Sequence, residues 1–358
     1  MYIIKIIVRN IIYITYLIVT VAILLEIIFI ILPTSSPSDL QPTLHEDDIL
    51  KYKPNQKFTF SEGKNFYKIV KKTTNNYGFF SSYDYVSNSY PDLMIIGDSM
   101  VQAAQISNSD SMGEIIQSKS NLEVYQLGVS GVPLSQYIQM LKFSKKEFSP
   151  KHYAVVVVGN DFDESLCSYR IKEGTWCFNK NFDLTFNPFY GYQGLRKIAR
   201  KSAAMRYLVF HIGFDWRGVL IKLGLKDPGL RTYSMYAGNT ERLKPEEIIA
   251  ASKKAIEVFF EKLSELNLLS KITIIIDADR QDVYNFTTSK SYFNDMREFM
   301  KKQANDKNVN YIDMDQVFRD NYKIFNKKFE FPTDGHWNEY AHKLVAEELL
   351  KILYSQTK

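Results

Sequence analysis

The sequence predicts an α/β protein, a doubly wound parallel sheet with helices on both faces, preceded by one membrane-spanning helix. From residue 92 onward, short apolar runs alternate with longer amphipathic stretches, which is the pattern of successive strand–helix–strand units. One run, Tyr153 to Val158, is continuously apolar and mostly β-branched, as a strand buried on both faces would be. A 22-residue apolar stretch at 11–32 contains one ionisable side chain and is long enough to cross a bilayer.

The periodicity places each element of the main domain. Expected strands cover residues 93–96, 122–127, 153–158, 272–276 and 309–312, and expected helices cover 110–120, 134–146, 245–267, 291–304 and a last segment from Asn338. Parallel neighbours need crossover connections, and such crossovers are right-handed. The elements therefore complete a single α/β domain with helices on the two faces of one sheet.

The apolar stretch at 11–32 is interpreted as an uncleaved signal anchor. As a helix it spans roughly 33 Å at 1.5 Å per residue, against a hydrocarbon core of about 30 Å. A signal-peptide core is usually about 7–15 residues, and no Ala-x-Ala site follows this stretch. The alternative is a long-cored signal peptide cleaved near Ser35 or Ser36. Glu26, inside the span, either marks a helix partner or, as we prefer, stays protonated or reaches the outer interface.

Charges that flank the stretch predict its orientation. Lys5 and Arg9 precede it, whereas the first basic residue after it is Lys51. Because positive flanks stay on the cytoplasmic side, everything after Pro33 should lie outside the cytoplasm, in the periplasm or at the cell surface. The net charge of +5 is not concentrated in a basic tail and gives no reason to expect a nucleic-acid partner.

Three regions are expected along the chain. Residues 1–32 form a cytoplasmic stub and anchor, 33–90 a linker and small β-rich collar, and 91–358 the main domain. Within the main domain, residues 165–235 hold 12 Lys and Arg against 4 Asp and Glu, interleaved with aromatics. Such an insert is usually a solvated helical cap. The alternative is a lid that rests on anionic lipid headgroups or grips an acidic substrate.

The two cysteines, Cys167 and Cys177, are ten positions apart and flank Glu173-Gly174, a turn-forming pair. In an oxidising compartment they would close a disulfide loop worth roughly 2–3 kcal/mol, with two buried free thiols as the alternative. They are too few to build a zinc site, and the isolated histidines lack metal-ligand spacing. No metal is therefore expected.

Four loops bring reactive or hydrogen-bonding groups to one edge of the expected sheet, because ligands bind beyond the carboxyl ends of parallel strands. The loops are Gly97-Asp98-Ser99, Gly128-Val129-Ser130-Gly131, Gly159-Asn160-Asp161 and Thr333-Asp334-Gly335-His336-Trp337-Asn338. Asp98 and Asp161 are expected to satisfy backbone N–H groups in these turns.

These groups assemble into one reaction, acyl transfer. A serine hydroxyl needs a base, and His336 can take the proton of Ser99 at neutral pH, with Asp334 holding the imidazole in the right tautomer. The backbone N–H groups of Ser99 and Gly131 and the side-chain amide of Asn160 can stabilise a tetrahedral oxyanion. Taken singly, Gly131 could be a turn glycine and Asn160 a helix cap. All four loops in this order indicate a site.

Arg280 is a further candidate. It follows the expected strand that ends at Ile276, so it is predicted at the rim of the pocket, where it would contact an anionic substrate. The alternative is a solvated arginine.

At these residues the chain resembles the SGNH/GDSL hydrolase superfamily. Gly97-Asp98-Ser99 is similar to the first family block, Gly131 to the second, Gly159-Asn160-Asp161 to the third, and the Asp334/His336 loop to the fifth. The resemblance covers residues 92 to about 353. It implies a flavodoxin-like three-layer domain and the hydrolysis or transfer of acyl esters, without metal or organic cofactor.

The last block departs from the family pattern. The family usually has Asp-x-x-His, whereas one residue separates Asp334 from His336. The related pattern Asp-x-His-Trp occurs in relatives that handle O-acetyl groups on cell-surface polysaccharides, and this similarity favours carbohydrate O-acyl chemistry. It leaves open whether Asp334, Asp313, Asp315 or a backbone carbonyl orients the imidazole.

The expected function is a serine esterase that hydrolyses an acylated small molecule or an O-acetylated cell-surface glycan. An O-acyltransferase with the same site would differ only in whether water or a sugar hydroxyl attacks the acyl-enzyme, which the sequence does not decide. A non-catalytic assembly protein on the same scaffold would have lost its nucleophile, base or donors, and all of these are present.

Overall fold

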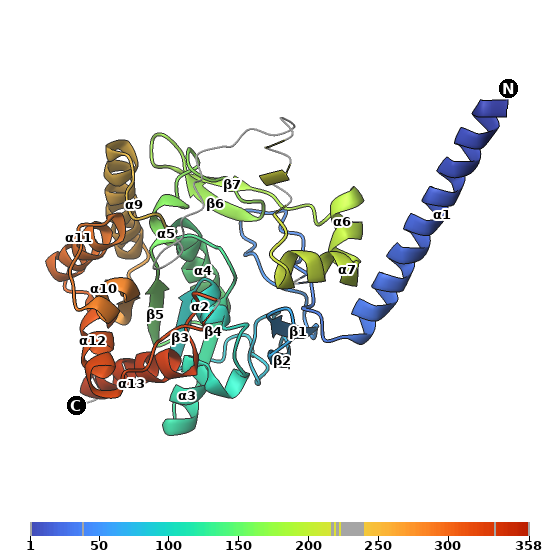
Figure 1. Ribbon diagram of the computed structural model, residues 1–358. Coiled ribbons are helices and arrows are strands. Elements are labelled where there is room, and N and C mark those ends of the chain that lie inside the picture. The colour runs from blue at the N-terminus through green and yellow to red at the C-terminus, as the bar shows by residue number, and fades with distance from the viewer. Residues whose placement is uncertain are drawn as a thin grey trace. The chain divides into compact units, whose positions relative to one another are not determined.

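The computed structural model describes residues 2–37, 39–215, 218, 219, 222, 240–332 and 334–356 (Figure 1). The chain divides into two compact units. The small unit is Met1–Ser38 with Phe58–Lys71 and Tyr192–Pro228, and the large unit is Asp39–Lys57 with Lys72–Gly191 and Gly229–Lys358. The predicted collar at 33–90 is thus divided between the units and is not a region of its own.

The large unit is built on a parallel sheet of five strands in the order β4-β3-β5-β8-β9. The strands are β3 (Leu93–Gly97), β4 (Val124–Gly128), β5 (His152–Val157), β8 (Ile272–Ile276) and β9 (Asn310–Asp313). Counted along the chain, this is the doubly wound order 2-1-3-4-5, in which the ligand-binding crevice lies where the chain reverses direction between the first and third strands. The predicted flavodoxin-like fold is confirmed.

Helices cover both faces of this sheet (Figure 1). They are α2 (Ser99–Gln102), α3 (Met112–Lys119), α4 (Leu134–Glu147), α5 (Asn160–Asp163), α9 (Glu246–Glu265), α10 (Arg280–Asn285), α11 (Tyr292–Asp306), α12 (Met314–Phe325) and α13 (Glu339–Gln356). Alternate strand residues such as Ile95 and Val156 pack with side chains of α3, α12 and α13 in one core cluster. The intervening Ile96 and Val155 are equally buried, on the opposite face, where α4, α9 and α11 pack.

The predicted helices and strands occur within about three residues of their expected bounds. The elements of the large unit that were not predicted include the short helices α2 and α5, the helices α10 and α12, and an antiparallel hairpin of β6 (Thr175–Phe178) and β7 (Leu184–Asn187). The hairpin lies in the basic insert, so the first part of that insert is not a helical cap. Residues 216, 217, 220, 221 and 223–235 of the insert lie outside the described residues.

The small unit contains α1 (Tyr2–Ile31), whose segment Ile4–Ile31 is long and apolar enough to cross a membrane, as a signal sequence would also be. It also contains α6 (Gly194–Lys201), α7 (Ala203–Arg206) and most of the two-stranded sheet of β1 (Lys57–Glu62) and β2 (Lys68–Thr73). The carboxylate of Glu26 accepts hydrogen bonds from Ser202 Oγ (2.6 Å) and from Ala203 N (2.7 Å). Glu26 therefore caps the first turn of α7. This agrees with the expectation that Glu26 marks a helix partner, which was not the alternative that we preferred from the sequence.

Candidate active site

Ser99 begins α2, directly after the first strand of the sheet. The preceding Asp98 is the N-cap of that helix, and its carboxylate accepts hydrogen bonds from Met100 N (2.9 Å) and Ser99 Oγ (3.1 Å). Both Asp98 and Ser99 are buried. Burial raises the pKa of Asp98, whereas the hydrogen bonds and the charge of His336 lower it. Asp98 thus accepts a hydrogen bond from a backbone N–H group in this turn, as predicted, and it also accepts one from the Ser99 hydroxyl.

The loop after β4 lies beside the loop after β3. Val129 N donates to Gly97 O (3.3 Å), which joins the ends of the two strands. A Cβ atom on Gly128 would lie 2.2 Å from Gln102 N, so only glycine permits α2 to pack this closely on the strand end. Gly131 has φ +66°, a left-handed backbone conformation that favours glycine, so the backbone conformation alone explains why this residue is a glycine.

Asn160 opens α5, at the end of β5. It is 6% exposed, the N-cap position belongs to Gly159, and no side-chain cap bond is made there. Within the described part of the chain, Asn160 Oδ1 has no hydrogen-bond partner. The helix-cap alternative therefore has no support in the geometry.

Asp161, the next residue, has a structural task. Its carboxylate accepts from Val158 N (2.8 Å) and Tyr137 Oη (2.9 Å). Burial raises its pKa well above the usual range, and the nearby charge of Asp98 raises it further. The ends of β3 and β5 are therefore close enough for their carboxyl groups to interact.

His336 and Asp334 form a hydrogen-bonded pair. His336 Nδ1 bonds Asp334 Oδ1, and His336 N donates to the same oxygen at 2.9 Å. The other carboxylate oxygen accepts from Gln105 Nε2 at 3.2 Å. Burial disfavours the carboxylate, but the bonds and charge of His336 hold the pKa of Asp334 below its usual value. Asp334 thus bonds the ring through Nδ1, so Nε2 is the ring nitrogen that takes no part in this pair.

The His336 loop meets the Ser99 helix. Trp337 N lies 3.3 Å from Met100 Sδ, so the residues that follow the proposed base and nucleophile are in contact. Trp337 is buried, and its Nε1 donates to Asp277 Oδ1 at 2.9 Å, which ties this loop to the end of β8. Among the described residues, no hydrogen bond joins Ser99 to His336. The Ser99 hydroxyl donates to Asp98 instead.

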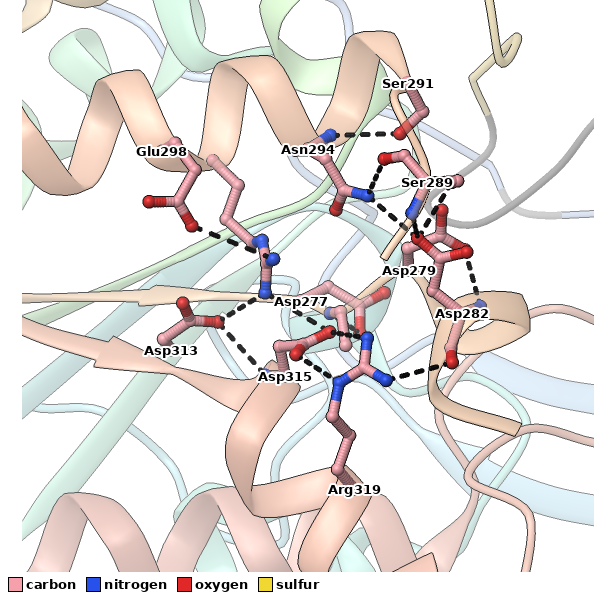
Figure 2. A network of polar contacts seen from close by, with 12 residues as sticks. Asp277, Asp279, Asp282, Ser289, Ser291, Asn294, Glu298, Asp313, Asp315 and Arg319 are labelled. Atoms are coloured by element: carbon pink, nitrogen blue, oxygen red, sulfur yellow. Dashed lines mark hydrogen bonds and ion pairs between the residues drawn. The ribbon is translucent and has the colours of Figure 1, made fainter. Parts of the chain in front are cut away.

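The two other carboxylates considered for the imidazole are engaged elsewhere (Figure 2). Asp313 Oδ1 bonds Arg297 Nη1 (3.0 Å) and caps α12 through Asp315 N (3.1 Å). Asp315 Oδ2 accepts from Arg319 Nε (2.6 Å). Of the three candidates, Asp334 is the one that contacts His336.

Arg280 is buried and ion-paired. Its side chain is 6% exposed, with Nη2 3.3 Å from Asp277 Oδ2 and Nη1 3.8 Å from Glu330 Oε2. It follows Asp279, which caps α10, and this turn carries the side chain inward toward two carboxylates. The substrate contact expected from the sequence stays a prediction.

Cys167 and Cys177 form a disulfide with Cα atoms 5.1 Å apart, and the enclosed loop follows α5. Gln105, Arg170 and Lys172 belong near the site and were not singled out from the sequence, since nothing in their local pattern distinguishes them. Among the described residues, no group of three or more His, Cys, Asp or Glu side chains could hold a metal ion.

The strand order is that of a doubly wound, flavodoxin-like α/β scaffold, and it brings the serine, glycine, asparagine and histidine loops to one edge of the sheet.

No family model and no curated protein matches the chain. Among solved structures, it is similar to an acetyl xylan esterase, AlAXEase, with 13% identity, a TM-score of 0.40 and coverage of 73% of this chain and 98% of that one. A lipolytic G-D-S-L family member from Veillonella parvula DSM 2008 has 14% identity, a TM-score of 0.37 and coverage of 73% and 96%. A lipase/acylhydrolase from Enterococcus faecalis has 10% identity, a TM-score of 0.38 and coverage of 74% and 96%. Likenesses this distant leave the reaction of this chain undecided.

Proposed function

We propose that the protein is a serine esterase of the SGNH/GDSL type. Ser99 is the nucleophile, His336 its base and Asp334 the group that orients the base. The observation that carries this proposal is the Asp334-bound His336 on a loop that contacts the Ser99 helix, with Trp337 N 3.3 Å from Met100 Sδ. A nucleophile, a base and a third group that orients the base are the parts that acyl transfer requires.

The reaction proceeds in two halves. Ser99 Oγ attacks the ester carbonyl while its proton passes to His336 Nε2, and the backbone N–H groups of Ser99 and Gly131 and the amide of Asn160 bind the oxyanion. The C–O bond to the leaving alcohol then breaks, and His336 returns the proton to that alcohol. In the second half, His336 activates a water molecule, which attacks the acyl-enzyme and releases the acid and free Ser99.

The proposed substrate class is an O-acetylated glycan. Its support is the sequence Asp334-Gly335-His336-Trp337, which resembles the Asp-x-His-Trp pattern of relatives that handle O-acetyl groups on cell-surface polysaccharides. In the structure, Trp337 is buried and fixes this loop through Asp277. With one residue between Asp334 and His336, the backbone N–H and the ring of His336 both bond the same carboxylate oxygen. This short pattern therefore forms a self-contained acid–imidazole unit.

We also propose that α1 remains as an anchor and that the large unit lies outside the cytoplasm. Glu26 of α1 caps α7, so the helix is part of the folded small unit. Thr34 and Ser35 are 6% and 7% exposed, and Ser35 Oγ donates to Ser61 O (2.9 Å). Cleavage near Ser35 would therefore have to cut chain that is buried in this fold.

The direct test is labelling by a serine-directed fluorophosphonate and turnover of p-nitrophenyl acetate. Ser99→Ala should lose both while keeping its thermal melting temperature, because removing such a nucleophile costs orders of magnitude in rate. Ser118→Ala, an exposed serine on α3, is the matched control and should keep both. Unchanged hydrolysis by Ser99→Ala would end the assignment of this site.

A further inference from the structure

Two cationic side chains lie over Gly131. A Cβ atom on Gly131 would be 3.3 Å from Lys172 Nζ and 3.8 Å from Arg170 Nη2. Gly131 N–H is one of the proposed oxyanion donors, so both cations stand beside the position of the scissile carbonyl. Neither residue has a role in the reaction as described above.

The loop that carries these cations is held in place at several points. Lys172 Nζ donates to Ser130 O at 2.6 Å, the backbone position directly before Gly131. Lys172 O accepts from Thr175 Oγ1 at 2.9 Å, and Arg170 N donates to Leu166 O at 2.9 Å. The disulfide between Cys167 and Cys177 closes the same loop. The cations are thus fixed by the backbone around them, as a binding subsite requires.

The local charges favour an anion. Arg170 pairs with Glu164, whose side chain is 9% exposed, while Lys172 bonds an uncharged carbonyl oxygen. Burial and, next, the charge of Arg170 lower the pKa of Lys172 to about 7, although the charges of Glu164 and Asp98 act in the opposite direction. The charges of Arg170 and Lys172 repel each other, and a bound anion would relieve that repulsion.

We propose that Arg170 and Lys172 form a subsite for an anionic group of the substrate, beside the oxyanion donor Gly131. The inference rests on the proposed esterase function and names its substrate class: acyl esters of acidic sugars, in which a carboxylate lies a few bonds from the acylated hydroxyl. A planar guanidinium and an ammonium together suit a carboxylate, because the first offers paired donors and the second a point charge.

The test compares two matched esters on the full-length protein in detergent. One is a mono-O-acetylated hexuronic acid, and the other is the O-acetylated hexose that carries a hydroxymethyl group in place of the carboxylate. Wild type should prefer the uronate in kcat/KM by about ten- to a hundred-fold, the range expected for one or two hydrogen bonds to a charged group. Lys172→Met and Arg170→Gln should each lower that ratio, the double variant should bring it near one, and Lys172→Arg should retain most of it.

Lys180→Met, an exposed lysine between β6 and β7, is the charge-matched control and should keep the wild-type ratio. Equal turnover of both esters by wild type would overturn the subsite and leave the esterase intact. Equal losses on both esters in Lys172→Met would also overturn it, because the cation would then act on the reacting oxygen or on the loop. Failure to hydrolyse either ester, with no Ser99-dependent labelling, would instead defeat the proposed function.

Discussion

Asp98 connects the groups of the candidate site although it takes no part in the proposed reaction. Its carboxylate binds the Ser99 hydroxyl, caps the helix that carries Ser99, and interacts electrostatically with His336 and Lys172. The charge of Asp98 raises the pKa of the nearby Asp161, whose carboxylate accepts a hydrogen bond from Tyr137 Oη. Because both carboxyl groups are buried, we expect that a change in the charge of either one alters the electrostatic potential at Ser99.

Asn160 gives the sharpest residue-scale test of the oxyanion site. Asn160→Ala should lower kcat by about 10²–10³-fold with little change in KM, because its hydrogen bond strengthens as charge develops on oxygen. His336→Ala should remove nearly all acylation at neutral pH, since the base itself is lost. Steady-state kinetics and thermal melts on both variants check this. A destabilised but fully active Asn160→Ala protein would show that the residue is structural.

Lys172 should make substrate preference depend on pH. Its pKa of about 7 means that it is charged below that pH and neutral above it. The preference for the acetylated uronate over the acetylated hexose should therefore be largest below pH 7 and fall as pH rises through that value. The groups that set this pKa besides burial are Arg170, Glu164 and Asp98, all within the large unit. Measuring the ratio of the two kcat/KM values from pH 6 to 9 cancels every pH effect that the two esters share, and a flat ratio would contradict the prediction.

At the scale of elements, the loop that the disulfide between Cys167 and Cys177 closes carries Arg170 and Lys172, which are proposed to select acidic substrates. It follows α5, which carries Asn160, and it leads into the β6–β7 hairpin. Leu166 and Phe178 form a bridge across its base, and Cys167 N donates to Phe178 O at 2.9 Å. This first part of the basic insert was expected to form a helical cap. It lies instead beside Ser130 and Gly131.

Removing the disulfide should have two effects. The Cys167→Ser, Cys177→Ser double variant should lose about 2–3 kcal/mol of unfolding free energy, because the closed loop no longer restricts the unfolded chain. It should also prefer the acetylated uronate less than wild type, since Arg170 and Lys172 lose a constraint. Denaturant unfolding and the paired-ester assay measure these effects, and non-reducing peptide mapping of wild type should recover the two cysteine peptides linked. Recovery of both as alkylated thiols would refute the bond.

At the scale of the whole molecule, the anchor proposal predicts where the protein is found. The intact mass should include residues 1–36, and the protein should sediment with membranes and resist carbonate extraction, since α1 is retained as a span. A protease added outside spheroplasts should digest the large unit, because Lys5 and Arg9 stay on the cytoplasmic side. A soluble product that begins near residue 36 would indicate a cleaved signal sequence, and protection of the large unit would reverse the orientation.

The sequence by itself determined the sheet and the positions of its reactive loops. A continuous apolar, β-branched run such as Tyr153 to Val158 favours a strand buried on both faces, and parallel strands present their carboxyl ends at one edge. These are local and topological rules, so the roles of Ser99 and His336 could be proposed without coordinates. Only the tertiary structure decided which groups surround them.

The partners of these residues come from distant parts of the chain. Gln105 reaches Asp334 across 229 positions, and Asp313 is held by Arg297, whereas Asp334 contacts His336. Arg280 is turned inward by a helix that the sequence did not reveal. Lys172 lies over Gly131 because the loop closed by the Cys167–Cys177 disulfide folds back onto the segment that contains Gly131. Such contacts depend on how loops pack against one another, and residue periodicity carries no information about that packing.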